Sequence, residues 1–312
     1  MKNTTKQNTP KNRGFLAQDF VRNKELYLMV IPVLIFYIMF HYAPMYGAII
    51  AFKNYTPAQG IVNSGWVGLR HFIQFFKSPY FDTVIINTLR ISLTNILLNF
   101  PAPIILALLI NEMKCVRYSR IVQSITYMPH FISLVVICGM IRTFTMDTGV
   151  IVTLLSYFGF ERTSLLLHKE YFVPVYVLST VWQSMGWGSI IYLAALSGID
   201  QGLYEAAKID GAGKWRQTIS ITIPGIMPTI ITMLILDVGK ILNVGYEKVL
   251  LLYNDATAPV AEIISTYVYK KGLIEQSWSF SSAVGLFNSI INLILILTTN
   301  YISKKTTEVG LW

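Results

Sequence analysis

Charged residues are scarce in this sequence. Asp, Glu, Lys and Arg make up only 13% of the 312 residues, whereas 54% are hydrophobic and the mean hydropathy is +0.52. Soluble globular proteins carry about 25% charged residues. A chain of this length therefore has too little charge to cover a surface that faces water, and we expect much of its surface to face lipid.

The net charge of +9 does not by itself indicate a nucleic-acid partner. The basic residues stand in short clusters between long apolar runs, and no basic stripe alternates with aromatic residues. We predict no nucleic-acid binding.

Cysteine is also scarce. Cys115 lies in a basic connector and Cys138 in an apolar run, which argues against a disulfide between them. Neither has a second Cys or a His at the spacing of a metal site. We therefore predict no metal site and no cofactor.

Catalytic motifs are missing as well. The sequence contains no G-x-x-x-x-G-K-[ST] phosphate loop, no H-E-x-x-H, no C-x-x-C and no G-x-S-x-G. Its four histidines are far apart and are interpreted as packing or interfacial residues. We predict that the chain is not an enzyme, and that any ATP hydrolysis coupled to it is supplied by another polypeptide.

Long apolar runs, in contrast, are abundant. A membrane helix needs about 20 mostly apolar residues, and six segments meet this length: 27–50, 84–111, 121–143, 171–196, 225–249 and 279–302. The first is too long for a signal peptide and is followed by no small-residue cleavage site, so we interpret it as a retained helix. The predicted fold class is all-α: a polytopic membrane protein with a bundle of six transmembrane helices.

The Lys and Arg residues of alternate connectors predict the orientation. The N-terminal tail, the second and fourth connectors and the C-terminal tail hold fourteen of them, whereas the opposite connectors hold seven. Both termini are therefore predicted to lie in the cytoplasm. We divide the chain into a cytoplasmic polar tail at 1–25 and a transmembrane domain at 26–312.

The cytoplasmic connector between the fourth and fifth spans has the pattern of an ordered element. One face of a short helix follows the spacing i, i+3, i+4 and i+7: Leu203, Ala206, Ala207 and Asp210. Gly211 follows, and a glycine can adopt the positive φ at which a chain turns sharply. Trp215 and Ile219 then give a second short helix an apolar stripe, and Pro224 begins the next span. The alanines favour docking into a groove of a protein partner, since a face that lies on lipid favours Leu and Phe.

This connector resembles the EAA motif of ABC importer permeases. The motif is E-A-A, three residues, G, nine residues and I-x-L-P, and here it reads Glu205-Ala206-Ala207, Gly211 and Ile221-Thr222-Ile223-Pro224, with Ile in place of Leu. Thr218 departs from a position that is commonly aromatic in the family. The resemblance implies a coupling loop at 198–224 whose helix sits in a cleft of the ATP-binding subunit. The implied ATPase-coupling residues are Glu205, Ala206, Ala207, Asp210, Gly211, Ala212 and Pro224.

Other segments extend the resemblance over nearly the whole chain. They are similar to the polysaccharide and complex-sugar permeases of maltose-transporter type: Trp66-Val67-Gly68-Leu69, Asn87-Thr88-Leu89, Tyr127-Met128-Pro129 and Leu242-Asn243-Val244-Gly245-Tyr246. The resemblance implies a permease subunit of a binding-protein-dependent ABC importer in the cytoplasmic membrane of a prokaryote, forming half of the path of an oligosaccharide. The implied partners are a second permease subunit, two copies of an ATP-binding subunit, an extracellular sugar-binding protein and the carbohydrate substrate.

Polar residues inside apolar spans usually face the bundle interior or a wet cavity. On a helical fifth span, four polar side chains would form one stripe within about 120°: Asp237, Lys240, Asn243 and Glu247. In one interpretation Asp237 and Lys240 neutralise each other and hold helices together. In the other, the stripe lines the substrate path and offers hydrogen bonds to sugar hydroxyls, with Asn243 the favoured contact.

Two further residues complete the candidate substrate path. Arg90 lies on a comparable polar arc of the second span. Tyr246, like Trp182 and Trp187, could stack on a sugar face, although packing inside the bundle is the commoner use of such residues. The candidate set is thus Asn243, Lys240, Asp237, Tyr246 and Arg90.

An ion-coupled secondary transporter is the alternative from another class. Such a protein needs inverted repeats and broken helices around a site at the membrane midplane, and no repeat is visible in the sequence. Co-purification with an ATPase subunit would favour the importer, whereas uptake driven by an ion gradient would favour the secondary transporter.

Overall fold

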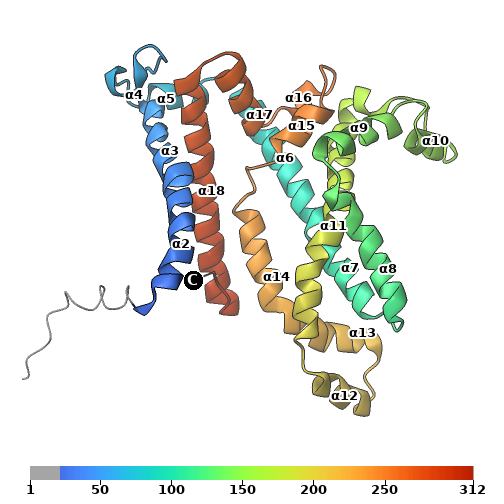
Figure 1. The fold of residues 1–312 in the computed structure, drawn as a ribbon. Helices are drawn as coiled ribbons and strands as arrows, with labels where there is room; N and C mark the ends of the chain where they lie inside the picture. Colours follow the sequence, from blue (N-terminus) through green and yellow to red (C-terminus); the bar gives the residue numbers. More distant parts are fainter. Residues whose placement is uncertain (1–21, 312) are drawn as a thin grey trace, which may run out of the picture.

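The computed structural model describes residues 22–311, which form an assembly of helices (Figure 1). Within this range the only β contact is an isolated antiparallel bridge between Lys53 and Trp66. The all-α prediction is confirmed. Most of the predicted polar tail lies outside the described residues, because the first long helix begins at Lys24.

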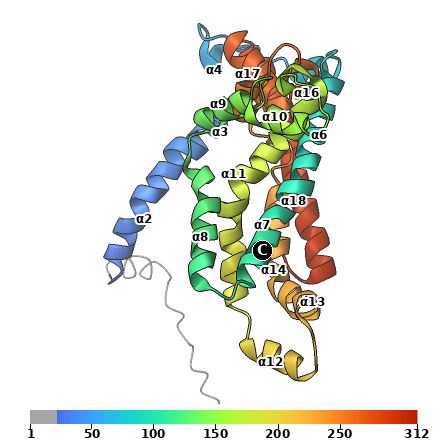
Figure 2. The same ribbon diagram turned by 90° about the vertical axis from the view of Figure 1, so that its right-hand side faces the viewer.

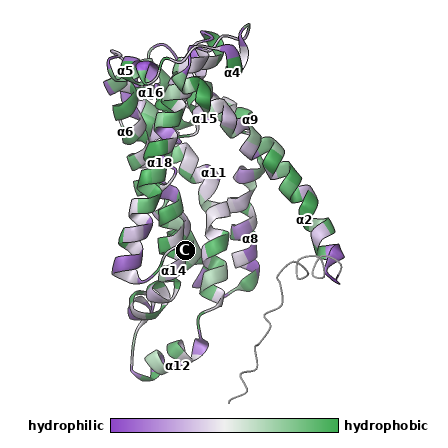
Figure 3. Cartoon of the chain, turned by 90° about the vertical axis from the view of Figure 1, so that its left-hand side faces the viewer, coloured by the Kyte–Doolittle hydropathy of each residue, from purple (hydrophilic) through white to green (hydrophobic). Residues whose placement is uncertain are grey.

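The first predicted span is one helical segment with changing pitch. It consists of α2 (Lys24–Tyr37), the π-helical η1 (Ile38–Tyr42), α3 (Ala43–Met45) and the 3₁₀-helical η2 (Tyr46–Phe52). No residue of α2 is buried, and α2 slants away from the other helices in Figure 2. Its surface is hydrophobic along most of its length, as Figure 3 shows. The outward face of α2 is therefore an apolar surface that the chain itself leaves uncovered.

The second span runs through α6 (Phe81–Asn99) and α7 (Pro101–Asn111). Pro101 stands at the beginning of α7, where its missing N–H costs little. The fourth span is α11 (Lys169–Ser197), which packs against both α6 and α7. The sixth span is α18 (Trp278–Thr307).

The third predicted span, 121–143, does not form one straight helix. Instead, α8 (Val116–Tyr127) and η3 (Met128–Phe131) end before α9 (Leu134–Phe144), and the two parts meet at an angle of 100°. Two extended residues, Ile132 and Ser133, cause the bend, and the Ser133 hydroxyl accepts a hydrogen bond from the Val136 N–H at the beginning of α9. The prediction of a single continuous span was wrong here.

The prediction of the fifth span, 225–249, was wrong for the second half of that range. The helix α14 (Ile223–Val238) ends at Val238, and the chain continues as turns until α15 (Tyr246–Leu252) begins. Gly239 packs so closely on α18 that a Cβ there would lie 2.8 Å from Cδ1 of Ile296. An amide on the same helix, Asn292, accepts a hydrogen bond from the Leu242 N–H (3.2 Å). The neighbouring helix thus supplies a hydrogen-bond acceptor for a backbone N–H group that the break leaves without a partner in its own helix.

Four helical segments of the described chain are long and apolar enough to cross a membrane: 24–52, 81–111, 214–238 and 278–307. The bent pair α8–α9 would make a fifth. In Figure 1, α11 runs between the two ends of the assembly like its neighbours. Its 29 residues include Trp182, Gln183 and Ser184, which lower its hydropathy below that of the other long helices.

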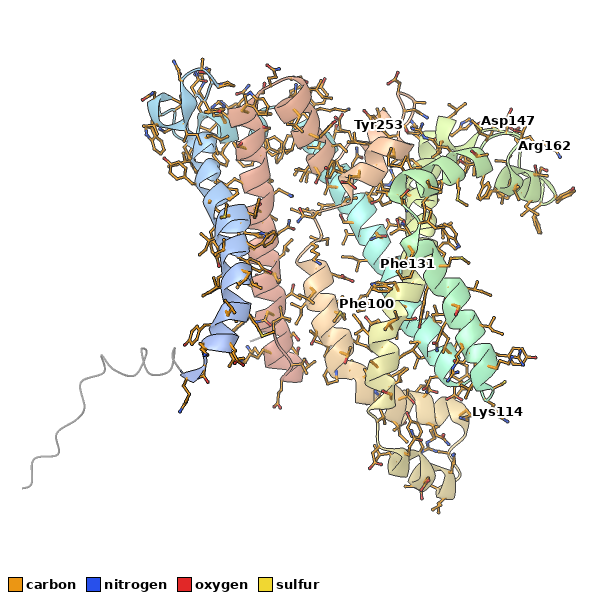
Figure 4. The ribbon with its side chains drawn as sticks, in the orientation of Figure 1. Phe100, Lys114, Phe131, Asp147, Arg162 and Tyr253 are labelled. Carbon is orange, nitrogen blue, oxygen red and sulfur yellow. The ribbon has the colours of Figure 1, made fainter. Side chains whose placement is uncertain are left out.

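Short helices form a layer at the upper end of Figure 1. They are α4 (Gly60–Asn63), α5 (Arg70–Phe76), α10 (Val150–Ser156), η4 (Leu165–Leu167), α16 (Ala258–Ala261), α17 (Ile264–Tyr269) and η6 (Lys270–Ile274). An aromatic cluster around Phe75, Tyr267 and Phe280 ties this layer to α18. Asp147 and Arg162 lie at this end, whereas Lys114 lies at the opposite end, near the connector that holds α12 (Gln201–Ile209) and α13 (Lys214–Gln217) (Figure 4). The connectors thus alternate between the two ends, as the predicted topology requires.

Candidate coupling element and substrate cavity

The connector at 198–224 has the predicted local structure of helix, glycine break and helix. The carboxylate of Asp200 caps α12 by accepting a hydrogen bond from the Gly202 N–H (2.9 Å). Glu205, Ala206 and Ala207 lie within α12. Asp210 follows its last residue, and Gly211 adopts a φ of +76°.

The helix α12 projects beyond the long helices at the lower end of Figure 1 and buries none of its residues. Large apolar side chains of this connector are exposed as well: 87% of Ile209, 82% of Trp215 and 62% of Ile219. Nothing in the described chain packs on this apolar surface. Exposed apolar surface of this kind is typical of an interaction site.

Three side-chain contacts hold the connector, and the sequence did not reveal them. The Tyr204 hydroxyl lies 3.0 Å from the Thr222 hydroxyl at the base of α14. The buried amide of Gln217 donates to the Ala212 carbonyl oxygen (2.7 Å). The first contact joins residues on opposite sides of Gly211, and the second closes the turn between Ala212 and the end of α13. Only the folded loop brings these partners together.

The third contact joins the connector to a different part of the chain. Lys214 at the start of α13 forms an ion pair with Glu112 at the end of α7 (2.8 Å), and both side chains are exposed to water. The partners are about a hundred residues apart in the sequence, so no local pattern could have paired them.

The connector leads directly into α14. The π-helical turn η5 (Thr218–Thr222) joins α13 to α14, so that 214–238 is one helical segment. Pro224 stands in the first turn of α14. One end of this segment is therefore part of the exposed connector, and the other end reaches the break at Gly239.

A cavity of about 330 Å³ lies at this break. Its walls come from α6, α11, α14, α15 and the turns between α14 and α15. Phe100, labelled near mid-height in Figure 4, is one of its lining residues. The polar residues of the wall are Ser92, Asn95, Asn99, Tyr176, Thr180, Asp237, Lys240, Asn243 and Lys248.

Two buried polar atoms in this wall have no hydrogen-bond partner within residues 22–311: the Ser92 Oγ and the Asn95 Oδ1. Most buried polar atoms in proteins are hydrogen-bonded, so a group left without a partner calls for an explanation. Here both residues belong to the cavity wall, although these two atoms are themselves buried. The wall as a whole offers amides and hydroxyls, which can hydrogen-bond to the hydroxyl groups of a ligand.

Three of the five predicted substrate-path residues line this cavity: Asp237, Lys240 and Asn243. They meet there because the helix breaks, so the predicted geometry of one continuous stripe was wrong. The Asn243 Oδ1 also accepts a hydrogen bond from the Asn288 Nδ2 on α18 (2.8 Å). Asn243 therefore has a structural partner in addition to its place in the wall.

The other two predicted path residues lie outside this cavity. Arg90 is exposed on α6. Tyr246 lines a separate cavity of about 380 Å³ and lies beside the ring of Tyr269. Trp187 stacks on His130 with ring centroids 4.6 Å apart, in keeping with a packing role.

A third cavity, of about 820 Å³, opens in the layer of short helices. Lys77, Tyr80, Lys271, Glu275 and Trp278 are among its lining residues. Lys271 forms an ion pair with Glu275 (2.7 Å), and this hydrogen bond raises the pKa of the Lys271 ammonium group. Within the described part of the chain, no three His, Cys, Asp or Glu residues gather as a metal site would require.

Comparison with known proteins places this geometry among transport proteins. Residues 92–308 match the family described as "Binding-protein-dependent transport system inner membrane component". The Bacillus subtilis polygalacturonan/rhamnogalacturonan transport system permease protein YteP is 44% identical over 96% of this chain and 94% of its own length. Protein LplB of the same organism is 44% identical over 93% of this chain and 92% of its own length.

A solved structure agrees with these relatives. It is that of a bacterial ABC transporter involved in the import of the acidic polysaccharide alginate, and one of its chains is 41% identical to this chain. The TM-score is 0.86, and the match covers 94% of this chain and 99% of that one. A second structure of an alginate transporter, with a TM-score of 0.86, contains a periplasmic protein bound to an alginate pentasaccharide.

Proposed function

Because the chain belongs to the family of binding-protein-dependent transport system inner membrane components, we propose that its two ends divide the work of an importer, with α12 receiving the ATPase and the cavity passing the sugar. The chain is the permease subunit of a carbohydrate ABC importer. The family transports rather than catalyses, and the ATPase activity lies in a separate subunit. Membership in this family leaves no basis for the ion-coupled alternative.

The coupling assignment rests on the exposed surface of the connector. The helix α12 is well formed and capped, yet it buries no residue. Its fixed position relative to α14 comes from the Tyr204–Thr222 and Gln217–Ala212 contacts. In this proposal Glu205, Ala206 and Ala207 meet the ATP-binding subunit, and Gly211 sets the turn that allows them to do so.

The substrate assignment rests on the cavity at the break in the fifth span. Asn95, Asn243 and Ser92 offer donors and acceptors of the kind that sugar hydroxyls require. The names of the relatives mention polygalacturonan, rhamnogalacturonan and the acidic polysaccharide alginate. We assign an oligosaccharide that contains uronate units as the cargo.

The assembly contains further subunits in this proposal. A binding protein delivers the sugar at the layer of short helices, where the cavity of about 820 Å³ opens. A second permease subunit completes the path and covers the apolar face of α2, and two ATP-binding subunits dock at the opposite end. Both termini then lie in the cytoplasm of a prokaryotic cell.

The single observation that carries the proposal is the continuity of 214–238, which joins the exposed coupling element to a residue of the cavity wall, Asp237. Site-directed cross-linking tests it. In a chain with Cys115→Ser and Cys138→Ala, the variant Leu203→Cys on α12 should cross-link to the ATP-binding subunit of the assembled transporter.

Leu69→Cys provides the matched control, because Leu69 is exposed to a similar extent (59%, against 53% for Leu203) but lies in the layer at the other end. It should not cross-link to the ATP-binding subunit. Equal cross-linking from both positions, or none from Leu203→Cys, would contradict the assignment of α12.

A further inference from the structure

Lys248 is a buried cation in the wall of the substrate cavity. It lies in α15, only 5% of its surface is exposed, and it is among the residues that line the cavity. Its Nζ donates a hydrogen bond to the Thr180 Oγ1 on α11 (2.8 Å) and lies 5.3 Å from the centre of the Tyr176 ring. A lysine is almost never buried to this extent without a counter-charge.

No carboxylate in the described chain supplies that counter-charge. Ion pairs in the described chain join Lys214 to Glu112, Lys270 to Glu262 and Lys271 to Glu275. None of these pairs includes Lys248. An ammonium group has three N–H donors, and Thr180 accepts only one of them. Two donors are therefore left for a ligand.

The net charge of the cavity also favours an anionic ligand. Its wall contains two lysines, Lys240 and Lys248, and one carboxylate, Asp237, so that the cavity carries an excess of one positive charge. The neutral walls offer amides and hydroxyls. An anion that also bears hydroxyl groups would satisfy both features, whereas a neutral sugar would leave the buried ammonium group without a charged partner.

We propose that Lys248 is the residue that selects acidic sugars, by binding the carboxylate of a uronate unit while the amides and hydroxyls of the cavity wall contact its hydroxyl groups. This inference rests on the proposed role of the cavity as the substrate path. It adds to that role a residue that distinguishes charged from neutral saccharides.

A structural role for Lys248 predicts different behaviour. If its function were to hold α15 against α11 through Thr180, removing the charge would weaken the binding of every sugar to the same extent. A test must therefore compare ligands that differ mainly in charge. Trigalacturonate and its methyl ester are such a pair, because esterification converts each carboxylate to a neutral ester and leaves the sugar backbone unchanged.

The experiment measures the binding of both probes to the assembled transporter in lipid nanodiscs, without the binding protein. The wild-type complex should bind the acid more tightly than the ester. Lys248→Gln should weaken binding of the acid by roughly tenfold to a hundredfold, the range for a hydrogen bond to a charged group, and leave binding of the ester unchanged. Lys305→Gln, which removes an exposed lysine near the end of α18, is the matched control and should alter neither.

Thr180→Val removes the one hydrogen bond that Lys248 makes within residues 22–311 and should preserve the preference for the acid. An equal loss for acid and ester in Lys248→Gln, no loss for either, or a wild-type complex that does not prefer the acid would overturn the inference. Asn95→Trp, which places a large ring in the wall of the cavity, separates this failure from that of the proposed path. If Asn95→Trp abolishes binding of both probes while Lys248→Gln does not discriminate between them, the path stands and the selective role of Lys248 falls.

Discussion

At the scale of single residues, Gly211 has the clearest physical requirement. Its φ of +76° lies in the left-handed region, which costs any other L-residue about 1–2 kcal/mol. No other atom lies within 4 Å of the place where a Cβ would stand, so a larger side chain would meet no clash inside the chain. A substitution here should alter the turn after α12 and the surface presented to a partner, while leaving the fold intact.

We therefore predict that Gly211→Leu yields a membrane-inserted permease with poor coupling. Sugar uptake, and the ATPase activity stimulated by loaded binding protein, should both fall about tenfold, as a loss of about 1.4 kcal/mol of docking energy would produce. Gly213→Leu is the matched control, because Gly213 has an ordinary φ of −69° and equally open surroundings. Normal uptake and ATPase activity in Gly211→Leu would refute the coupling assignment.

A second prediction concerns Asn243, which has both a cavity-lining and a structural role. Asn243→Ala should raise the KM of uptake, because the cavity loses a hydrogen-bonding group. It should also lower thermal stability, because the Asn288 amide loses its acceptor, at a cost of about 1–3 kcal/mol.

Asn288→Ala separates the two effects. It breaks the same hydrogen bond from the other side, and Asn288 does not line the cavity at the break. The stability should fall in both variants, whereas KM should rise only in Asn243→Ala. Equal KM values in the two variants would return Asn243 to a purely structural role.

At the scale of elements, the connector shows what a local pattern can and cannot reveal. The i, i+3, i+4 spacing of Leu203, Ala206 and Ala207 and the position of Gly211 were sufficient to predict two short helices and the turn between them. The bend after Pro129 and the break after Val238 were missed. The local signals beside them, Pro129 and Gly239, do not by themselves distinguish a break from a continuous span, because prolines and glycines also occur inside membrane helices. Partners distant in the chain stabilise the second break, as with the Asn292 amide on α18.

The same limit applies to the candidate site. Asp237, Lys240 and Asn243 could be selected because charge and amide groups are rare inside an apolar run. Lys248 was not among the candidates, because its burial depends on contact with α11. Arg90, chosen on the same grounds as the first three, lies away from the cavity. The sequence identifies the polar residues of a membrane segment, but the packing of neighbouring helices decides whether their side chains face the cavity.

A third prediction follows for the buried contact inside the connector. Gln217→Leu retains the size of the side chain and removes the hydrogen bond to the Ala212 carbonyl oxygen. Cross-linking of Leu203→Cys to the ATP-binding subunit should persist, while stimulated ATPase activity should fall severalfold, because α12 would no longer be held against the base of α14.

Glu112→Gln provides the contrast for this prediction. It removes the exposed ion pair to Lys214, which is worth at most about 1 kcal/mol. ATPase activity should change little. A larger effect in Glu112→Gln than in Gln217→Leu would show that the connector is held mainly from α7.

At the scale of the whole molecule, the two ends differ in construction. One end is a layer of short helices with an aromatic cluster, and the other consists of the connector and helix ends (Figure 1). Reporter fusions after Lys114, Arg216 and Lys304 should be cytoplasmic, and fusions near Asn63, Lys169 and Gln276 should be external. The opposite result would remove α12 from the compartment that contains ATP, and with it the coupling assignment.

The segment 214–238 has a mechanical consequence. Twenty-five helical residues at 1.5 Å each make a rod of about 37 Å. If the lower end is pivoted by only about 5°, the upper end moves sideways by about 3 Å, the length of one hydrogen bond. In the proposed mechanism, a small rotation that the ATPase imposes on the connector would suffice to move Asp237 out of hydrogen-bonding reach of a bound sugar. The length of this rod would then set the stroke required at the ATPase.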